Sequence, residues 1–168
     1  PSHGFQVSIG LLAATAYYEQ FLHSDIARLD IEGAVAAWPE LAEAEKYALE
    51  LYAGTDFPEI GLKETRAKYI GKQQLREPGD VAGGLRSQIE HGCSDIIRFA
   101  EASRRLRIVG APTRPEEIGI TRQRMKDSVI RAQHIRRRFT ILDVAVRTNL
   151  LGQWTDAIFG PGGGWGIQ

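Results

Sequence analysis

The stretch from residue 3 to residue 23 constrains the fold most, because its large apolar side chains recur at helical spacing with small residues between them. Both faces of such a helix are apolar or small, which is typical of a helix surrounded by other helices. We therefore predict a central, mostly buried helix over residues 3–23. Its large apolar residues are Val7, Leu11, Leu12, Tyr18, Phe21 and Leu22, and its small ones are Gly10, Ala13, Ala14 and Ala16.

Further helices are predicted along the rest of the chain, separated by proline, glycine and capping residues. No segment shows the strict alternation of apolar and polar residues that a half-buried strand requires. We therefore predict an all-α fold, a multi-helix domain. The helices are expected after a Ser24-Asp25 cap and through residue 36, at 40–52, at 63–75, within 81–108 with an interruption near 91–92, at 122–138, from 139 or 140 to 148, and at 151–159, with connectors at 57–61, 77–80 and 110–120.

The length of 168 residues predicts one domain, which we place at residues 1–159. Residues 160–168 form a glycine-rich tail, and ordering glycine costs much backbone entropy. We expect this tail to be flexible unless Trp165 docks on the domain.

Charge and cysteine content exclude several classes of protein. The 21 basic and 21 acidic residues cancel, so no global field attracts nucleic acid or an anionic membrane. The single cysteine, Cys93, cannot form an internal disulfide, which suits a reducing cytoplasm, and it is expected to be a small, half-buried helix residue. No apolar stretch reaches the ~20 residues that a membrane span needs, and residues 1–3 show no basic leader of a signal peptide.

Arginines cluster in the second half of the chain, and this cluster has two interpretations. They could bind a substrate phosphate or a nucleic-acid backbone, or they could form a solvated, ion-paired helix face. The neutral balance favours the ion-paired face, and Arg104, Arg105 and Arg107 are expected to be balanced by acids such as Glu101. If residues 136 and 138 lie on a helix, at most one of them points inward. The cluster comprises Arg122, Arg124, Arg131, Arg136, Arg137 and Arg138.

Four histidines are candidate metal ligands. His3 begins the first predicted helix and could bind a divalent metal through one neutral ring nitrogen, but a catalytic site normally needs three protein ligands. His23 ends that helix and is expected to interact with its dipole. His91 and His134 have no second ligand at an obvious metal spacing and are expected to be structural or solvated.

Three segments, in order, carry a resemblance to a known superfamily. Residues 2–10 (SHGFQVSIG) resemble the His-Gly-Glu-x-Val-x-x-Gly segment of the iron-containing alcohol dehydrogenase and dehydroquinate synthase superfamily. Residues 110–120 (GAPTRPEEIGI) are similar to the Gly-Ala-Pro-Thr-x-Pro-Glu-Glu-Leu-Gly-Ile loop of its sn-glycerol-1-phosphate dehydrogenase branch. Residues 136–143 (RRRFTILD) are similar to that branch's Arg-x-Arg-Tyr-Thr-Ile-Leu ending.

The resemblance implies the C-terminal helical domain of a two-domain enzyme. Its partner would be an N-terminal nucleotide-binding α/β domain that binds NAD or NADP, which we expect to be absent from this chain. The sequence has no glycine-rich loop between a strand and a helix that could hold a pyrophosphate. The chain alone is therefore expected to be inactive.

The resemblance also implies a metal site of one aspartate and two histidines, of which only the second histidine has a counterpart here, His3. The other two ligands would precede Pro1. Zinc suits this ligand set, and nickel or iron are alternatives. Phe5 stands where the superfamily has an acidic residue, so a supporting carboxylate is missing at that position.

Three functions remain open. The first is the metal-binding domain of an NAD(P)-linked polyol-phosphate dehydrogenase that interconverts dihydroxyacetone phosphate and glycerol 1-phosphate. The second is a cyclising lyase similar to dehydroquinate synthase, and the third is a non-catalytic helical interaction module. In all three, the face that meets the nucleotide domain is expected to leave an apolar or mixed patch near His3 and the 110–119 loop, and such a patch favours a homodimer.

Overall fold

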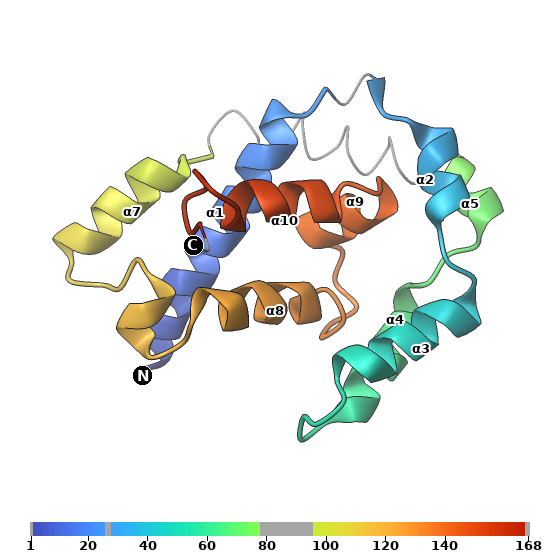
Figure 1. Ribbon diagram of the computed structural model, residues 1–168, viewed down its shortest axis with the longest axis horizontal. Coiled ribbons are helices and arrows are strands. Elements are labelled where there is room, and N and C mark those ends of the chain that lie inside the picture. Colours follow the sequence, from blue (N-terminus) through green and yellow to red (C-terminus); the bar gives the residue numbers. More distant parts are fainter. Residues whose placement is uncertain (1, 26–27, 78–95, 167–168) are drawn as a thin grey trace.

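The computed structural model describes residues 2–25, 28–77 and 96–166, and every regular element in these ranges is a helix (Figure 1). The predicted all-α class is therefore confirmed. Within the same ranges, no helix has both the length and the apolar character that crossing a bilayer requires. The elements are α1 (His3–His23), α2 (Ile31–Ala37), α3 (Leu41–Leu51), α4 (Pro58–Lys68), α5 (Lys72–Arg76), α7 (Phe99–Ile108), the 3-10 helix η3 (Pro115–Ile118), α8 (Arg122–Ala132), α9 (Ile141–Arg147) and α10 (Leu151–Phe159).

The first helix has the predicted bounds. The Ser2 hydroxyl caps its N-terminus by accepting the backbone N–H of Phe5 at 3.3 Å. One face, which includes Leu12 and Tyr17, is fully buried. The opposite face is not, since Val7 and Leu11 are about half exposed. The prediction of a mostly buried helix is thus right for one face and wrong for the other.

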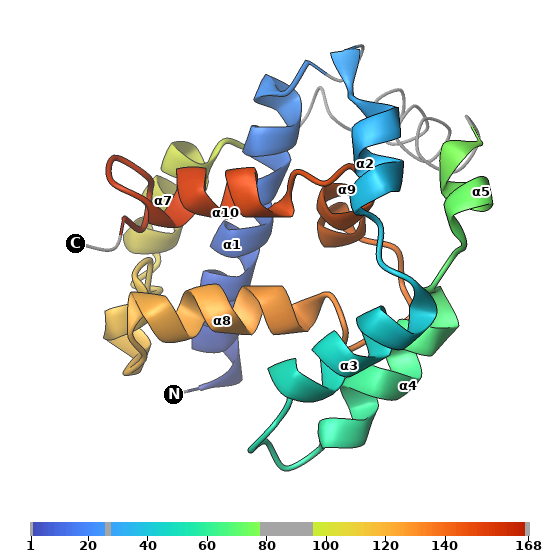
Figure 2. The same ribbon diagram turned by 45° about the vertical axis from the view of Figure 1, so that its right-hand side comes forward.

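Helix α1 runs through the centre of the molecule, and α8 and α10 cross it (Figures 1 and 2). It also contacts α7, α9 and η3, while α2 pairs with α5 and α3 pairs with α4. The α3–α4 pair forms an arm at one side of the molecule (Figure 1). The largest fully buried side chains belong to α1, α10 and the segment after α10, and they are Tyr17, Phe21, Trp154, Phe159 and Trp165.

The second predicted helix starts later than its sequence indicates. Ser24 does not cap it, because the Ser24 hydroxyl donates to the carbonyl of Gln20 and accepts the indole N–H of Trp154 at 3.0 Å. Asp30 is the actual cap of α2, and its carboxylate accepts the backbone N–H of Gly33 at 2.8 Å. The predicted stop at residues 38–39 is correct.

The segment predicted as a connector at 57–61 is the start of α4, with Pro58 in the first turn. Proline is favoured there because its missing N–H has no partner in a helix anyway. The predicted helix at 63–75 is instead the rest of α4 and a separate α5. Gly61 fits because a Cβ there would lie 2.6 Å from the ring of Tyr52, so the absent side chain lets α3 and α4 approach closely.

Helix α8 ends at Ala132 rather than at residue 138. The carbonyl of Gln133 accepts the ammonium of Lys68 at 2.5 Å, and His134 is bonded to Thr65 of α4, so contacts with the arm replace further helical turns. The predictions for 139–148 and 151–159 agree with α9 and α10. Of the predicted 81–108 helix, α7 covers the last part, and residues 81–95, with His91 and Cys93, lie outside the described ranges.

The segment after α10 meets the condition for an ordered tail up to residue 166. Trp165 is only 1% exposed, and its indole N–H donates to the carbonyl of Thr113 at 3.0 Å. Its ring also contacts the ring of Phe99 edge to face, with 5.6 Å between the centroids. Docking of one large aromatic side chain offsets the entropy that the glycines lose on ordering.

Candidate functional site

His3 is the first residue of α1 and is exposed. One turn and a half further along, the buried hydroxyl of Ser8 donates to the carbonyl of Pro112 at 3.1 Å. This hydrogen bond joins the first resembling segment to the second across more than a hundred residues. The structure therefore brings together the start of α1 and the 110–120 loop.

The 110–120 loop is held in shape by its own polar groups. The Glu117 carboxylate accepts the backbone N–H groups of Thr113 at 2.6 Å and Arg114 at 2.8 Å, and these bonds lower the pKa of Glu117. Gly119 ends η3 with a φ of 78°, a conformation that glycine adopts without strain. The Nε of Arg107 donates to the Thr113 hydroxyl at 3.1 Å.

A hollow of about 370 Å³ lies between this loop and the first turn of α1. Phe5, Arg107, Pro112 and Glu117 line it. The hollow thus combines an aromatic side chain from the first turn of α1, a guanidinium from α7 and a carboxylate from η3.

The third resembling segment also meets α1. Thr140 caps α9, since its hydroxyl and its backbone N–H both donate to Asp143 Oδ2, at 2.9 and 2.7 Å. Thr140 and Ile141 line a second cavity, of about 310 Å³, together with Gly10 and Ala13 of α1. The second and third resembling segments therefore both contact α1, the helix that begins within the first.

The histidines differ in their surroundings. In the described part of the chain, no group of three or more His, Cys, Asp or Glu side chains gathers as a metal would require, so His3 is the one candidate ligand that the resemblance assigns. Its imidazole alone does not make a metal site. His23 lies in the last turn of α1, as predicted, with its Nε2 3.2 Å from a guanidinium nitrogen of Arg98.

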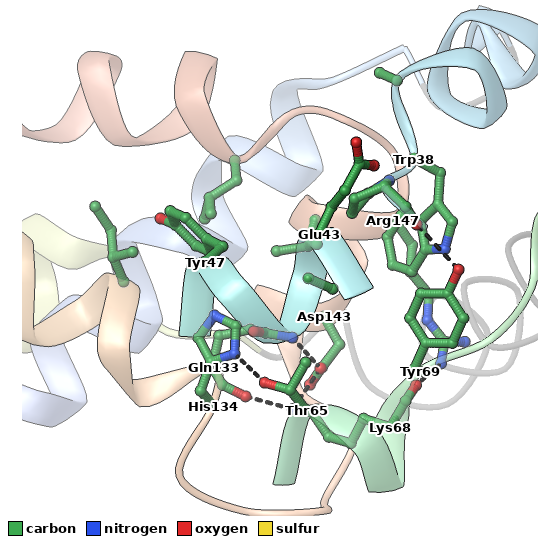
Figure 3. Close-up of a pocket in the computed structure, with 16 residues that line it drawn as sticks. Trp38, Glu43, Tyr47, Thr65, Lys68, Tyr69, Gln133, His134, Asp143 and Arg147 are labelled. Atoms are coloured by element: carbon green, nitrogen blue, oxygen red, sulfur yellow. Dashed lines mark hydrogen bonds and ion pairs between the residues drawn. The ribbon is translucent and has the colours of Figure 1, made fainter. Parts of the chain in front are cut away.

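A third cavity is one that the sequence does not predict. It has a volume of about 310 Å³ and lies between the α3–α4 arm and the segment that connects α8 to α9 (Figure 3). Lys68 and Asp143 form a buried ion pair in its wall, with 2.5 Å between Nζ and Oδ1 and side chains only 10% and 4% exposed. The side-chain amide of Gln133 also donates to Asp143 Oδ1, at 3.0 Å.

His134 lies beside this ion pair. Its Nδ1 is 2.8 Å from the hydroxyl of Thr65, and its ring is 6.0 Å from the ring of Tyr47. Burial lowers the pKa of His134 to about 4, and the positive charge of Lys68 lowers it further than Asp143 raises it. The expectation of a structural histidine is right in that His134 is hydrogen-bonded and largely buried. It is also neutral at physiological pH and faces a cavity.

No pattern in the sequence relates residues 68, 134 and 143 to one another. Lys68 is one polar residue among many in a weakly amphipathic segment, and Asp143 is only the last residue of the third resembling segment. The local sequence pattern that involves one of these residues is the capping pattern Thr140-x-x-Asp143. It predicts the start of α9 but not an ion pair.

The arginines are mostly engaged with the protein itself. Arg104 and Arg105 pair with Glu101, as expected, but Arg107 bonds to the 110–120 loop instead. Arg136, Arg137 and Arg138 are not on α8, because that helix ends before them, and all three are exposed. Further contacts are those of Arg122 with Glu116, Arg131 with the carbonyl of Leu51, and Arg137 with Glu64.

Comparisons of this chain with protein-family models, with curated proteins and with solved structures found no match.

Proposed function

We propose that this chain is the helical, metal-binding domain of an NAD(P)-linked polyol-phosphate dehydrogenase, most similar to the sn-glycerol-1-phosphate dehydrogenase branch. Its reaction would interconvert dihydroxyacetone phosphate and glycerol 1-phosphate. The observation that carries the proposal is that the second and third resembling segments both meet α1, the helix that begins within the first, through the Ser8 to Pro112 hydrogen bond and the cavity shared with Thr140 and Ile141.

Convergence supports the proposal because a chance match of three short motifs gives no reason for them to meet in space. In a functional site built from loops on a packed scaffold, in contrast, the segments that carry the site must lie close together. The Ser8 bond is buried, so it fixes the first turns of α1 against the loop. His3 begins the helix that this bond holds, and Phe5 of the same first turn lines the hollow together with Arg107.

His3 would be this chain's ligand to the metal, which would be zinc, nickel or iron. The remaining ligands of the site would come from outside the described residues. A metal of this kind polarises a substrate hydroxyl. The described residues supply one ligand, so the part they play is to hold that imidazole in place. NAD or NADP would bind to a separate nucleotide-binding domain.

The test is an activity assay on the protein expressed from the complete open reading frame that contains this chain. Purified with zinc, nickel or iron, it is expected to oxidise NADH or NADPH only when dihydroxyacetone phosphate is present. Glycerone, the same ketone without phosphate, is the matched control substrate. Absence of oxidation with any of the three metals would contradict the proposal, and so would equal rates with both ketones.

An interaction module remains the second candidate, and one observation favours it. Apolar side chains near the start of α1 and at the end of α7 are exposed, namely Phe5, Val7, Leu11, Ile108 and Val109, which we call the apolar patch. Exposed apolar surface of this kind is typical of an interface with another protein or domain. A protein that binds a partner through this patch and shows no dehydrogenase activity would fit this function.

A further inference from the structure

The cavity between the arm and the α8–α9 connection has walls of two kinds, and neither has a part in the proposed function. One side is aromatic and fixed. The rings of Trp38 and Tyr69 stack with 6.2 Å between centroids, the indole N–H donates to the carbonyl of Ile70 at 2.8 Å, and the Tyr69 hydroxyl donates to the carbonyl of Pro39 at 3.0 Å. Both side chains are therefore held in place before any ligand enters.

Tyr47 and His134 lie on the opposite side of the cavity (Figure 3). The space between these two sides has a volume of about 310 Å³, at the lower end of the range for small-molecule pockets. Two facing walls of flat side chains favour a flat, apolar body between them.

Thr65 and Asp143 lie between His134 and Tyr69 in the same view, and Asp143 is paired there with Lys68 (Figure 3). The acidic partner is saturated, because Asp143 Oδ1 accepts from Lys68 and Gln133 while Oδ2 accepts from Thr140 twice. The Lys68 ammonium, in contrast, has more N–H groups than acceptors among the described residues. Of its three N–H groups, two are used within the described residues, one by Asp143 and one by the carbonyl of Gln133.

The His134 imidazole adds a second polar group at the same place. Thr65 occupies Nδ1, so Nε2, on the other side of the ring, is the nitrogen that can meet a ligand. The charge of Lys68 lowers the pKa of His134 by more than the charge of Asp143 raises it, so the cation is the stronger of these two charges at the imidazole. The other acid in the lining, Glu43, is exposed and accepts the backbone N–H of Glu40 at 3.0 Å, at the start of α3.

We propose that this cavity binds a small aromatic monocarboxylate, with its ring between the Trp38–Tyr69 wall and the Tyr47–His134 wall and its carboxylate near Lys68 Nζ and His134 Nε2. Arg147, the other cation in the lining, donates to the carbonyl of Lys68 at 3.4 Å and lies over the ring of Phe139, with 4.9 Å to the ring centroid. We therefore assign the ligand's charge to Lys68 and His134, and a single carboxylate fits these two groups better than a phosphate, which normally collects several charge-assisted bonds. The ligand would contact both the arm and the α8–α9 connection, and so would link them.

The test is calorimetric titration of the protein with three probes of similar shape, namely indole-3-acetate, the uncharged indole-3-acetamide and indoxyl phosphate. Indole-3-acetate is expected to bind with a dissociation constant below about 1 mM, and the amide at least about tenfold more weakly, the factor that one charge-assisted hydrogen bond supplies. No saturable heat with indole-3-acetate, equal binding of the amide, or tighter binding of the phosphate would each overturn the proposal.

Two matched variants locate the binding. Ala44 lines the cavity, and Ala42 is exposed on the same helix and does not. Ala44→Phe fills the space and is expected to weaken indole-3-acetate binding at least about tenfold, while Ala42→Phe leaves it unchanged. Circular dichroism verifies that both variants fold. Unchanged binding to a folded Ala44→Phe variant would place the ligand elsewhere and overturn the proposal. The result does not depend on dehydrogenase activity, so the two proposals can fail separately.

Discussion

Lys68 and Asp143 are the residues whose local environment departs most from what their types suggest. Both are charged, yet both side chains are at least nine-tenths buried, and each is bonded to further polar groups. Removing charges from water is costly, and only a closely matched pair with satisfied hydrogen bonds offsets that cost. Loss of one partner therefore leaves the other charge buried alone.

We expect Lys68→Met to lower the free energy of unfolding by about 3–5 kcal/mol, the usual effect of breaking a buried ion pair. Lys46→Met is the matched control, because Lys46 is exposed and only 3.9 Å from Glu50. Its effect is expected to stay within about 0.5 kcal/mol. Urea denaturation of the two variants measures both values, and a similar small loss in each would show that the buried pair is not stabilising.

His134 predicts a dependence of stability on pH. In the folded protein its pKa is about 4, below the ordinary value of 6.5 that holds in the unfolded chain. The unfolded chain therefore binds a proton first as the pH falls, so the contribution of His134 is complete above about pH 6.5 and is lost progressively down to about pH 4, by at most about 3 kcal/mol.

The free energy of unfolding, measured from pH 7 to pH 4 for the wild type and for His134→Asn, isolates this contribution because the carboxylates affect both proteins alike. The wild type is expected to lose more stability than the variant over this interval. Parallel curves for the two proteins would mean that His134 protonates freely in the folded state.

At the scale of elements, the α3–α4 arm depends on the close contact at Gly61. A Cβ at this position would lie 2.6 Å from the ring of Tyr52, whereas a Cβ at Gly10 of α1 would meet nothing within 4 Å. Alanine is the better helix former by about 1 kcal/mol, so the two substitutions differ in sign. Gly61→Ala is expected to lower the melting temperature and Gly10→Ala to raise it, and a rise for both would contradict the tight contact between α3 and α4.

The elements that the sequence predicts well are those whose ends are set locally. Helix α1 has a serine cap at its start and an apolar pattern along its length, and the residues before Pro39 cannot continue a helix. The errors arise where distant contacts decide. Ser24 is used by Trp154, and α8 stops where Lys68 and Thr65 bind residues 133 and 134. Such contacts join residues 65 or more positions apart and leave no local pattern.

For the candidate site, the motifs predict that the start of α1 and the 110–120 loop belong together, and the Ser8 to Pro112 bond agrees. The cavity beside His134 is not predictable in the same way. Its residues come from α2, α3, α4, α8, α9, α10 and the segments that connect them, and each of them is ordinary in its own segment.

At the scale of the whole molecule, the apolar patch predicts self-association. Val7 is 52% exposed and directly precedes Ser8, which bonds to the 110–120 loop, and Val109 is 76% exposed and directly precedes that loop. Burying this surface between two copies would remove it from water. Sedimentation velocity is expected to show a dimer that Val7→Glu and Val109→Glu weaken, whereas Leu49→Glu, at an exposed position on α3, has no effect. A strict monomer at all concentrations would contradict this.

The central claim of the account is that His3 is a metal ligand in a site that the rest of the enzyme completes. The most direct measurement is the amount of zinc, nickel or iron bound per chain in the protein from the complete open reading frame, compared with its His3→Ala and His23→Ala variants. Both histidines are exposed and lie at opposite ends of α1, so the second variant is a matched control. The account predicts about one metal ion per chain in the wild type and in His23→Ala, and a loss of most of it in His3→Ala without unfolding. Equal metal content in all three proteins, or no bound metal in the wild type, would contradict it.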